Sequence, residues 1–286
     1  MTHISQKGCV LITGAGGRLG RLLLAARRDS PDLHHEFVFQ SRGDSADITW
    51  HPGDPVNRLP SCDAVIALWG ATSGNQQDLD QNARLATLTA DLARGLGARR
   101  VVHLSSAAVY GPGQMMNEDR PTENCNSYGK SKLDMEVSID MDRRRTGLAQ
   151  IALRLANVVG ADSLAPVLRG ERPALIDDFS ADPKRHLGPL RSYIGAKGLL
   201  QIFDALLTLP PETWPNVLNV AAPAPVAMDA LARAAGQAVI WQKAPESAVA
   251  EVTLDVSRLQ TLLPNITPAA TASDLIAEWR RLESLV

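Results

Sequence analysis

The stretch Cys9-Val10-Leu11-Ile12-Thr13-Gly14-Ala15-Gly16-Gly17-Arg18-Leu19-Gly20 decides the fold of this chain. Its apolar run, Cys9–Ile12, is typical of a buried strand, and glycines follow that run directly. Glycine adopts positive φ at little cost, so we expect a tight turn there. The pattern Leu19–Arg28, with apolar residues on one side, predicts a helix that begins at the turn. Because the N-terminus of a helix offers N–H groups and a positive dipole end, the stretch predicts a phosphate-binding turn; a glycine turn without a ligand is the alternative.

Strands and helices alternate through the first half of the chain. The predicted strands are Glu36–Gln40, Asp63–Leu68, Val101–Leu104 and Ile151–Leu155, and the predicted helices are Leu79–Leu96 and Tyr128–Arg145. This alternation is typical of βαβ units and a parallel sheet. The strands are continuously apolar, which indicates that helices cover both faces of the sheet. We therefore predict the α/β class and a Rossmann-type doubly wound parallel sheet.

The sequence pattern changes after about residue 157, where proline becomes frequent and the predicted helices and strands become shorter. We expect residues 1–156 to form the nucleotide-binding domain and residues 157–286 to form mainly a smaller C-terminal substrate-binding lobe. Helices are predicted at Leu199–Leu207 and Met228–Ala235. Val217–Val220 is expected to be a strand that returns to the main sheet.

Composition excludes several classes of partner. The chain has 286 residues and a formal net charge of −2, so we expect neither nucleic acid nor an anionic membrane as partner. The three cysteines, Cys9, Cys62 and Cys125, show no metal-binding spacing, and no metal site is predicted. No signal peptide or membrane-spanning run is recognised, so a cytoplasmic location is expected.

Tyr128 and Lys132 form a Tyr-x-x-x-Lys pair. Residues four apart share one face of a helix, so the ammonium is expected near the phenol. A free tyrosine has a pKa of about 10, and a neighbouring cation lowers that pKa. The pair therefore predicts a tyrosine that exchanges a proton with a substrate hydroxyl or carbonyl. An exposed polar helix face is the alternative interpretation.

Two further motifs carry a resemblance to a known family. Thr13-Gly14-x-x-Gly17-x-x-Gly20 and Ser105-Ser106-x-x-Val109-Tyr110-Gly111 resemble the cofactor loop and the catalytic-serine segment of the extended short-chain dehydrogenase/reductases, the NAD-dependent epimerase/dehydratase family. The resemblance implies NAD(P) as cofactor and Ser106, Tyr128 and Lys132 as catalytic residues. Lys132 would also bind the nicotinamide ribose. Ser105 fits a role in capping the strand end better than Ser106 does.

The resemblance also implies a set of cofactor-binding residues. They are Gly14, Gly17, Arg18, Leu19, Gly20, Ser41, Arg42, Asp47, Ile48, Trp69, Gly70, Ala71 and Lys132. Asp47 and Ile48 match an element that follows the third strand and flanks the adenine. The second strand ends Phe39-Gln40-Ser41-Arg42, without the acid that binds the NAD ribose. Ser41 and Arg42 would suit a 2′-phosphate, so NADP is favoured over NAD, and a solvated surface role for Arg42 remains the alternative.

The second half resembles the family less closely. The resemblance implies these substrate-binding residues: Thr72, Ser106, Ala107, Tyr128, Asn157 and Arg191. Ala107 and Ala108 stand where the family's dehydratases carry an acidic pair, which disfavours dehydration. Ala196-Lys197-Gly198 replaces the family's Val-Asp-Asp, which weakens the expectation of a standard sugar nucleotide.

Three functions stay open at this point. The first is an epimerase or reductase/dehydrogenase acting on a sugar nucleotide or a related hydroxy/keto substrate. The second is a reductase of a smaller carbonyl compound without a nucleotide. The third is a non-catalytic NAD(P)-sensing protein. The family further implies a homodimer formed through the helices at about 78–96 and 128–145.

Overall fold

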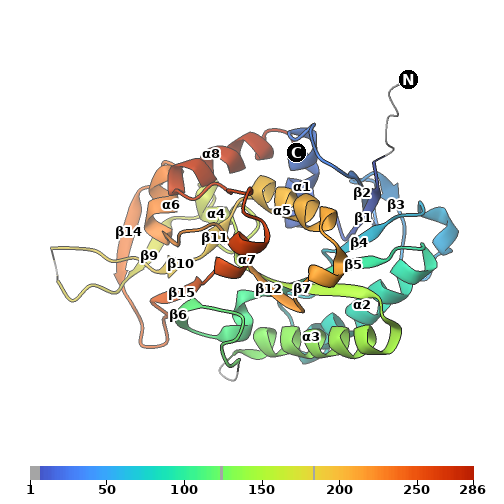
Figure 1. Ribbon diagram of the computed structural model, residues 1–286. Coiled ribbons are helices and arrows are strands. Elements are labelled where there is room, and N and C mark those ends of the chain that lie inside the picture. Colours follow the sequence, from blue (N-terminus) through green and yellow to red (C-terminus); the bar gives the residue numbers. More distant parts are fainter. Residues whose placement is uncertain (1–6, 123–124, 183) are drawn as a thin grey trace.

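The centre of the computed structural model, which describes residues 7–122, 125–182 and 184–286, is a sheet of seven parallel strands (Figure 1). The order of the strands across the sheet is β12-β7-β5-β4-β1-β2-β3. Their bounds are β1 Cys9–Thr13, β2 Glu36–Ser41, β3 Ile48–Thr49, β4 Ala64–Ala67, β5 Arg100–Ser106, β7 Ala149–Leu155 and β12 Val217–Val220. The chain order therefore reverses between β1 and β4, and ligands of doubly wound sheets bind at the carboxyl ends of such strands.

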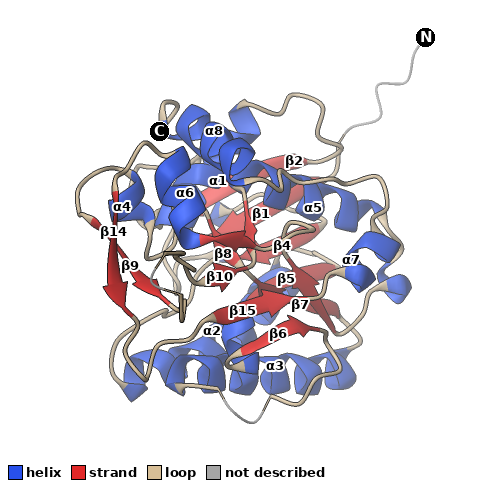
Figure 2. Cartoon of the chain, turned by 90° about the vertical axis from the view of Figure 1, so that its left-hand side faces the viewer, coloured by secondary structure: helices blue, strands red, loops and turns tan. Residues whose placement is uncertain are grey.

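Helices cover both faces of this sheet, as Figure 2 shows. The helices α1 (Arg18–Arg28) and α5 (Ala196–Thr208) lie on one face, and α2 (Gln76–Gly95) and α3 (Ser127–Thr146) lie on the other. Strand β1 illustrates the arrangement, because Val10 and Ile12 pack in the cluster of α1 and α5 while Leu11 packs in the cluster of α2. Successive side chains of a strand point to opposite faces, so a strand buried on both faces is continuously apolar.

The smaller lobe consists of short elements beside the carboxyl ends of the main strands. It contains the sheet β13-β10-β15-β6 and the pairs β11–β8 and β14–β9. The strands are β6 Gly113–Met116, β8 Asn157–Val158, β9 Ala174–Asp178, β10 Leu190–Arg191, β11 Tyr193–Ile194, β13 Val226–Ala227, β14 Val239–Lys243 and β15 Glu251–Leu254. The helices are α4 Ala165–Leu168, α6 Met228–Ala234, α7 Ser257–Leu262 and α8 Ala272–Glu283. Three short 3-10 helices, η1 Val56–Arg58, η2 Ala107–Tyr110 and η3 Pro211–Thr213, complete the described elements.

The predicted fold class and the predicted strands and helices are confirmed. The strand at 217–220 does return to the main sheet, where β12 pairs with β7. The division at residue 156 stays a prediction. Strand β6 precedes residue 156 but belongs to the smaller lobe, whereas α5 and β12 follow residue 156 but pack on or pair with the main sheet. Among the described residues, no helix is both long enough and apolar enough to cross a membrane.

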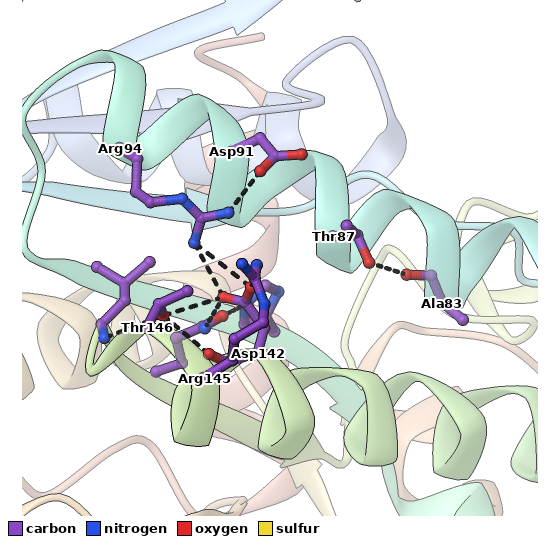
Figure 3. A network of polar contacts seen from close by, with 10 residues as sticks. Ala83, Thr87, Asp91, Arg94, Asp142, Arg145 and Thr146 are labelled. Carbon is purple, nitrogen blue, oxygen red and sulfur yellow. Dashed lines mark hydrogen bonds and ion pairs between the residues drawn. The ribbon is translucent and has the colours of Figure 1, made fainter.

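A polar network joins α2 to α3 near the C-terminal ends of both helices (Figure 3). The carboxylate of Asp142 accepts hydrogen bonds from Arg94 at 3.0 Å, from Arg145 at 2.6 Å and from Gln150 at 2.8 Å. Burial opposes the ionisation of Asp142, but these hydrogen bonds outweigh it and lower the pKa of the carboxyl. The network fixes the helix that carries Tyr128 and Lys132 against its neighbour.

Candidate active site

Gly14, in the turn after β1, and Gly20, in the first turn of α1, are required by packing within the protein. Gly14 has a φ of +77°, and a Cβ there would lie 2.7 Å from the backbone nitrogen of Trp69. A Cβ at Gly20 would lie 2.4 Å from the backbone of Ala15. Glycine at these positions therefore allows the turn, the next strand and α1 to approach closely.

The neighbouring glycines, Gly16 and Gly17, have no such packing reason. A Cβ at Gly17 would meet no described atom closer than 3.7 Å, and one at Gly16 none closer than 3.6 Å. Both line a cavity, and α1 begins directly after Gly17 without a side-chain cap among the described residues. A turn that leaves space above uncapped N–H groups fits the pyrophosphate of a dinucleotide.

The cavity beside the turn has a volume of about 860 Å³. The residues that line it are Gly14, Gly16, Gly17, Gln40, Ser41, Arg42, Gly43, Ser45, Pro52, Leu68, Trp69, Gly70, Ala71, Asp78, Gln81 and Leu85. Seven of the predicted cofactor residues are in this set: Gly14, Gly17, Ser41, Arg42, Trp69, Gly70 and Ala71. The sheet edge thus brings together segments from β1, β2 and β4, as a doubly wound sheet requires.

The other predicted cofactor residues lie outside this lining. Arg18 donates from Nη1 to the carbonyl of Asp162 at 3.1 Å, in the smaller lobe. Leu19 packs against the core, and Gly20 contacts Ala15. In the described part of the chain, neither Leu19 nor Gly20 lines the cavity.

Asp47 differs from its expected place. It immediately precedes β3 instead of following it, and Ile48 is the first residue of that strand. The Asp47 carboxylate forms an ion pair with Arg27 and accepts the N–H of Phe39 at 2.8 Å. Burial opposes its ionisation, but the hydrogen bonds from Arg27 and Phe39 and the charges of Arg27 and Arg28 together outweigh it and lower the pKa of Asp47. In the described residues this carboxylate holds α1 to β2, and it does not line the cavity.

The end of β2 presents an arginine to the cavity. Gln40 is buried and accepts the N–H of Gly14 at 3.2 Å, so it holds the turn. The hydroxyl of Ser41 donates to the carbonyl of Gly43 and accepts the N–H of Gly43 at 3.2 Å. Arg42 is exposed. The sequence has no carboxylate at positions 39–42, and the polar side chains of that segment that line the cavity are Gln40, Ser41 and Arg42.

Ser106, Tyr128 and Lys132 converge where β5 meets α3. Ser106 is the last residue of β5, and its hydroxyl is near enough to the phenol of Tyr128 to lower the pKa of that phenol. The same hydroxyl accepts the N–H of Ala108 at 3.2 Å and caps η2. We expected the capping role for Ser105, and that expectation was wrong, because the Ser105 hydroxyl donates to Glu136 at 2.6 Å.

Lys132 connects these residues to the cavity. Its side chain is buried, and Nζ donates to the carbonyl of Leu104 at 2.9 Å. Nζ lies 5.9 Å from the centre of the Tyr128 ring. A Cβ at Gly70, which lines the cavity, would lie 3.2 Å from Nζ. The ammonium is therefore at the boundary between the cavity and the Ser106–Tyr128 pair.

The pKa values at the site differ from the expected tuning. Burial lowers the pKa of Lys132 to about 8, against the opposing effect of Glu136. Burial raises the pKa of Tyr128, and the nearby Ser106 side chain opposes that rise. We expected Lys132 to lower the pKa of Tyr128, but burial is the largest influence on that pKa and raises it, while Lys132 Nζ donates to the carbonyl of Leu104.

Asn82 belongs to this site although the motifs did not indicate it. Its Oδ1 accepts the N–H of Ala71 at 3.0 Å, and its Nδ2 donates to the carbonyl of Ala71 and to the hydroxyl of Ser131, both at 3.0 Å. This amide ties the segment after β4 to α3. The available signal was an asparagine among the apolar positions of a predicted helix, between Leu79 and Ala86, where a polar side chain needs hydrogen-bond partners.

The predicted substrate residues are distributed around the same edge. Ala107 follows Ser106 directly in η2, and Thr72 follows the segment that lines the cavity. Asn157 is exposed on β8. Arg191, on β10, donates to the carbonyls of Leu190 at 2.8 Å, Ala250 at 3.1 Å and Val249 at 2.6 Å. Three of the five guanidinium N–H groups of Arg191 are thus used within the lobe.

The doubly wound sheet, the cavity at the carboxyl ends of its strands and the nearby Ser106, Tyr128 and Lys132 are together typical of a dinucleotide-binding α/β protein. The chain belongs to the NAD dependent epimerase/dehydratase family, whose model matches residues 10–221. The resemblance found in the motifs is therefore confirmed, and with it the extended short-chain dehydrogenase/reductase class of enzymes.

Individual relatives are similar over different lengths. The protein named Epimerase family protein ML0860 of Mycobacterium leprae (strain TN) is 25% identical over 84% of this chain and 80% of its own length. A UDP-glucose 4-epimerase of Streptomyces lividans is 34% identical, but the match covers 39% of this chain and 31% of that enzyme. This chain thus matches about a third of that relative's length.

Solved structures share the fold at low identity. A UDP-glucose 4-epimerase from Bifidobacterium longum, in complex with NAD+ and UDP, superposes with a TM-score of 0.76 at 18% identity, over 96% of this chain and 98% of that one. MoeE5, in complex with UDP-glucose and NAD, superposes with a TM-score of 0.75 at 21% identity, over 98% and 100%. These likenesses show the fold of the whole chain.

Proposed function

We propose that this protein is an NAD(P)-dependent epimerase or reductase/dehydrogenase acting on a sugar nucleotide or a related hydroxy/keto substrate. NAD(P), when bound beside the glycine turn, supplies the hydride acceptor or donor. Tyr128 takes a proton from the substrate hydroxyl in oxidation and returns one in reduction. Ser106 hydrogen-bonds the substrate oxygen and orients it towards Tyr128, and Lys132 hydrogen-bonds the nicotinamide ribose.

One observation carries this proposal. Tyr128, whose pKa the nearby Ser106 lowers, has Lys132 Nζ 5.9 Å from its ring centre, and Lys132 lies next to Gly70 at the cavity. A proton-transfer pair is thereby adjacent to a cavity whose glycine turn suits a dinucleotide. The names of the relatives, UDP-glucose 4-epimerases among them, support a sugar nucleotide as the first substrate to test.

The test is a screen of melting temperature and turnover. The protein is incubated with NAD or NADP and then with UDP-glucose, UDP-galactose or dTDP-glucose at millimolar concentration. We expect one of the cofactors to raise the melting temperature and a sugar nucleotide to raise it further, with epimerised or oxidised sugar as product. No shift with any sugar nucleotide at millimolar concentration would contradict that substrate class.

A specific observation favours a second substrate class, a smaller carbonyl compound without a nucleotide. Arg191, a predicted substrate-binding residue, bonds to three backbone carbonyls, and Lys197 bonds to Asp29 at 3.0 Å. If Arg191 is structural, Arg191→Gln lowers the melting temperature but leaves any shift caused by UDP unchanged. Lys243→Gln, a change of an exposed cation in the same lobe, is the control for loss of charge alone.

For the cofactor, we propose NADP in preference to NAD. The support is the position of Arg42 and Ser41 at the cavity and the lack of a carboxylate at 39–42. The Ser41 hydroxyl is already bonded to Gly43, so Arg42 is the main candidate for a 2′-phosphate contact.

We also propose a homodimer formed through α2 and α3. The support is that Val137 and Met141, on α3, are 58% and 67% exposed, which is unusual for neighbouring apolar side chains one helical turn apart. Analytical ultracentrifugation of the wild type and of Val137→Glu/Met141→Lys is the test. We expect a dimer that the double variant converts to a folded monomer; a monomeric wild type contradicts the proposal.

A further inference from the structure

Glu136 lies under the candidate active site, on the same helix as its tyrosine and lysine. It follows Lys132 by four residues, as Lys132 follows Tyr128, so the three side chains share one face of α3. The carboxylate accepts hydrogen bonds from the Ser105 hydroxyl at 2.6 Å and from Arg154 at 3.1 Å and 2.8 Å. Only 9% of the Glu136 side chain and 7% of the Arg154 side chain are exposed.

The register of the sheet explains why one carboxylate reaches both partners. Ser105 on β5 is paired with Arg154 on β7, so their side chains leave the same face of the sheet, the face that α3 covers. Ser105 directly precedes Ser106. Glu136 therefore joins the carboxyl ends of two strands to the helix that carries Tyr128 and Lys132.

Arg154 also donates outside the ion pair. One guanidinium nitrogen donates to the hydroxyl of Tyr110 at 2.9 Å and to the carbonyl of Glu118 at 3.3 Å. Tyr110 in turn donates to Asn219 at 2.8 Å. A buried ion pair with several further hydrogen bonds holds one geometry, which is what an aligned catalytic pair needs.

We propose that Glu136 is a positioning residue of the Ser106–Tyr128–Lys132 site. It fixes the end of β5 to α3, so that the Ser106 hydroxyl meets the Tyr128 phenol, and it provides the negative charge that keeps Lys132 protonated. The inference rests on the proposed function for the roles of those three residues.

The groups around Lys132 support the proposal that the charge of Glu136 keeps Lys132 protonated. Burial lowers the pKa of Lys132 to about 8, and Glu136 is the charged group that opposes this shift. His103, from β5, has its own pKa lowered by burial to about 4, so it is neutral at neutral pH. The segment after β4 and helix α2 contribute the uncharged Gly70 and Asn82. Arg154, from β7, is cationic and bound to Glu136.

The experiment is an NMR titration of isotope-labelled lysine side chains, in the full protein without substrate. The Lys132 signal is assigned by its loss in Lys132→Arg. In Glu136→Gln we expect the Lys132 midpoint to fall by roughly one pH unit, since a nearby opposite charge shifts a pKa by about that much or more. Asp134→Asn is the matched control, because it removes the same charge from the exposed side of α3 and should leave the midpoint in place.

Two further variants complete the test. One guards against misfolding of Glu136→Gln, and the other tests the hydrogen bond by which Glu136 holds the end of β5. Glu136→Gln leaves Arg154 unpaired, so Glu136→Gln/Arg154→Met, which removes both charges, is titrated alongside it. Ser105→Ala keeps the charge of Glu136, so we expect an unchanged Lys132 midpoint but a lower kcat.

An unchanged Lys132 midpoint in whichever Glu136 variant folds overturns the inference. Because the titration uses no substrate, its result stands even if the protein shows no NAD(P)-dependent turnover, which would contradict the proposed function alone.

Discussion

At the carboxyl edge of the main sheet, the cofactor side and the substrate side use their polar groups differently. On the cofactor side, Gly16 and Gly17 leave space at the cavity, and the uncapped start of α1 faces it. On the substrate side, Arg191 and Lys197 are bonded to groups of the protein itself. The first side is prepared for a ligand by its backbone, whereas the second holds its cations in internal contacts.

The difference has a physical origin. A dinucleotide is bound mainly by backbone N–H groups and close approach, and one strand-turn-helix segment provides both. A substrate is bound by side chains that several distant segments must bring together. The cofactor side can therefore stay recognisable while the substrate side diverges, and the following changes test that division.

The largest expected effect is at Tyr128. Tyr128→Phe removes the proton donor while leaving the ring in place, so kcat should fall about 10²- to 10⁴-fold. Binding of NAD(P)H, followed by its fluorescence, should persist, because the cavity is lined by other residues. Near-normal kcat in this variant would rule out Tyr128 as the acid/base.

The glycine turn allows a matched comparison of packing and binding. In Gly20→Ala the new Cβ lies 2.4 Å from Ala15, and we expect a loss of about 1–3 kcal/mol in the free energy of unfolding. In Gly17→Ala the nearest described atom is 3.7 Å away, so stability should change little while cofactor affinity falls about tenfold or more. Thermal melts and fluorescence titrations measure the two effects, and equal destabilisation in both variants would contradict the division of roles.

Most of the fold followed from local patterns. The strand, the turn and the helix of residues 9–28 lie together in sequence, and the continuously apolar strands placed helices on both faces. The two-residue strand β3 was not predicted, because two residues show no periodicity. The place of Asp47 was missed for the same reason.

The site was predictable only as far as its motifs reach. The Tyr128–Lys132 spacing placed both residues on one helix face, but the direction of the tyrosine pKa depends on burial, which no spacing shows. Asn82 and Glu136 act through partners 11 to 49 residues away in sequence. Such contacts follow from the register of strands and the packing of helices, and these appear only in three dimensions.

The preference for NADP or NAD tests whether a side chain, Arg42, also contributes to binding on the cofactor side. If Arg42 holds a 2′-phosphate, Arg42→Ala should weaken NADPH binding about 10- to 100-fold, in line with about 1.5–3 kcal/mol for a hydrogen bond to a charged group. NADH binding should be nearly unchanged. Arg58→Ala, at a surface arginine outside the cavity lining, is the control. Equal loss for both cofactors, or none for NADPH, would show that Arg42 does not read the 2′ position.

The smallest expected effect concerns the scaffold that supports the cofactor side. Hydrogen bonds hold the pKa of Asp142 below its ordinary value in the folded protein, so its contribution to stability is present at neutral pH. That contribution is lost as the pH falls below about 4, through the folded-state pKa. Asp142→Asn should therefore lower the free energy of unfolding by about 1 kcal/mol at pH ~7 and by less at pH ~3. Denaturant melts at both pH values measure this, and an equal difference at the two would mean that the Asp142 charge does not stabilise the α2–α3 pair.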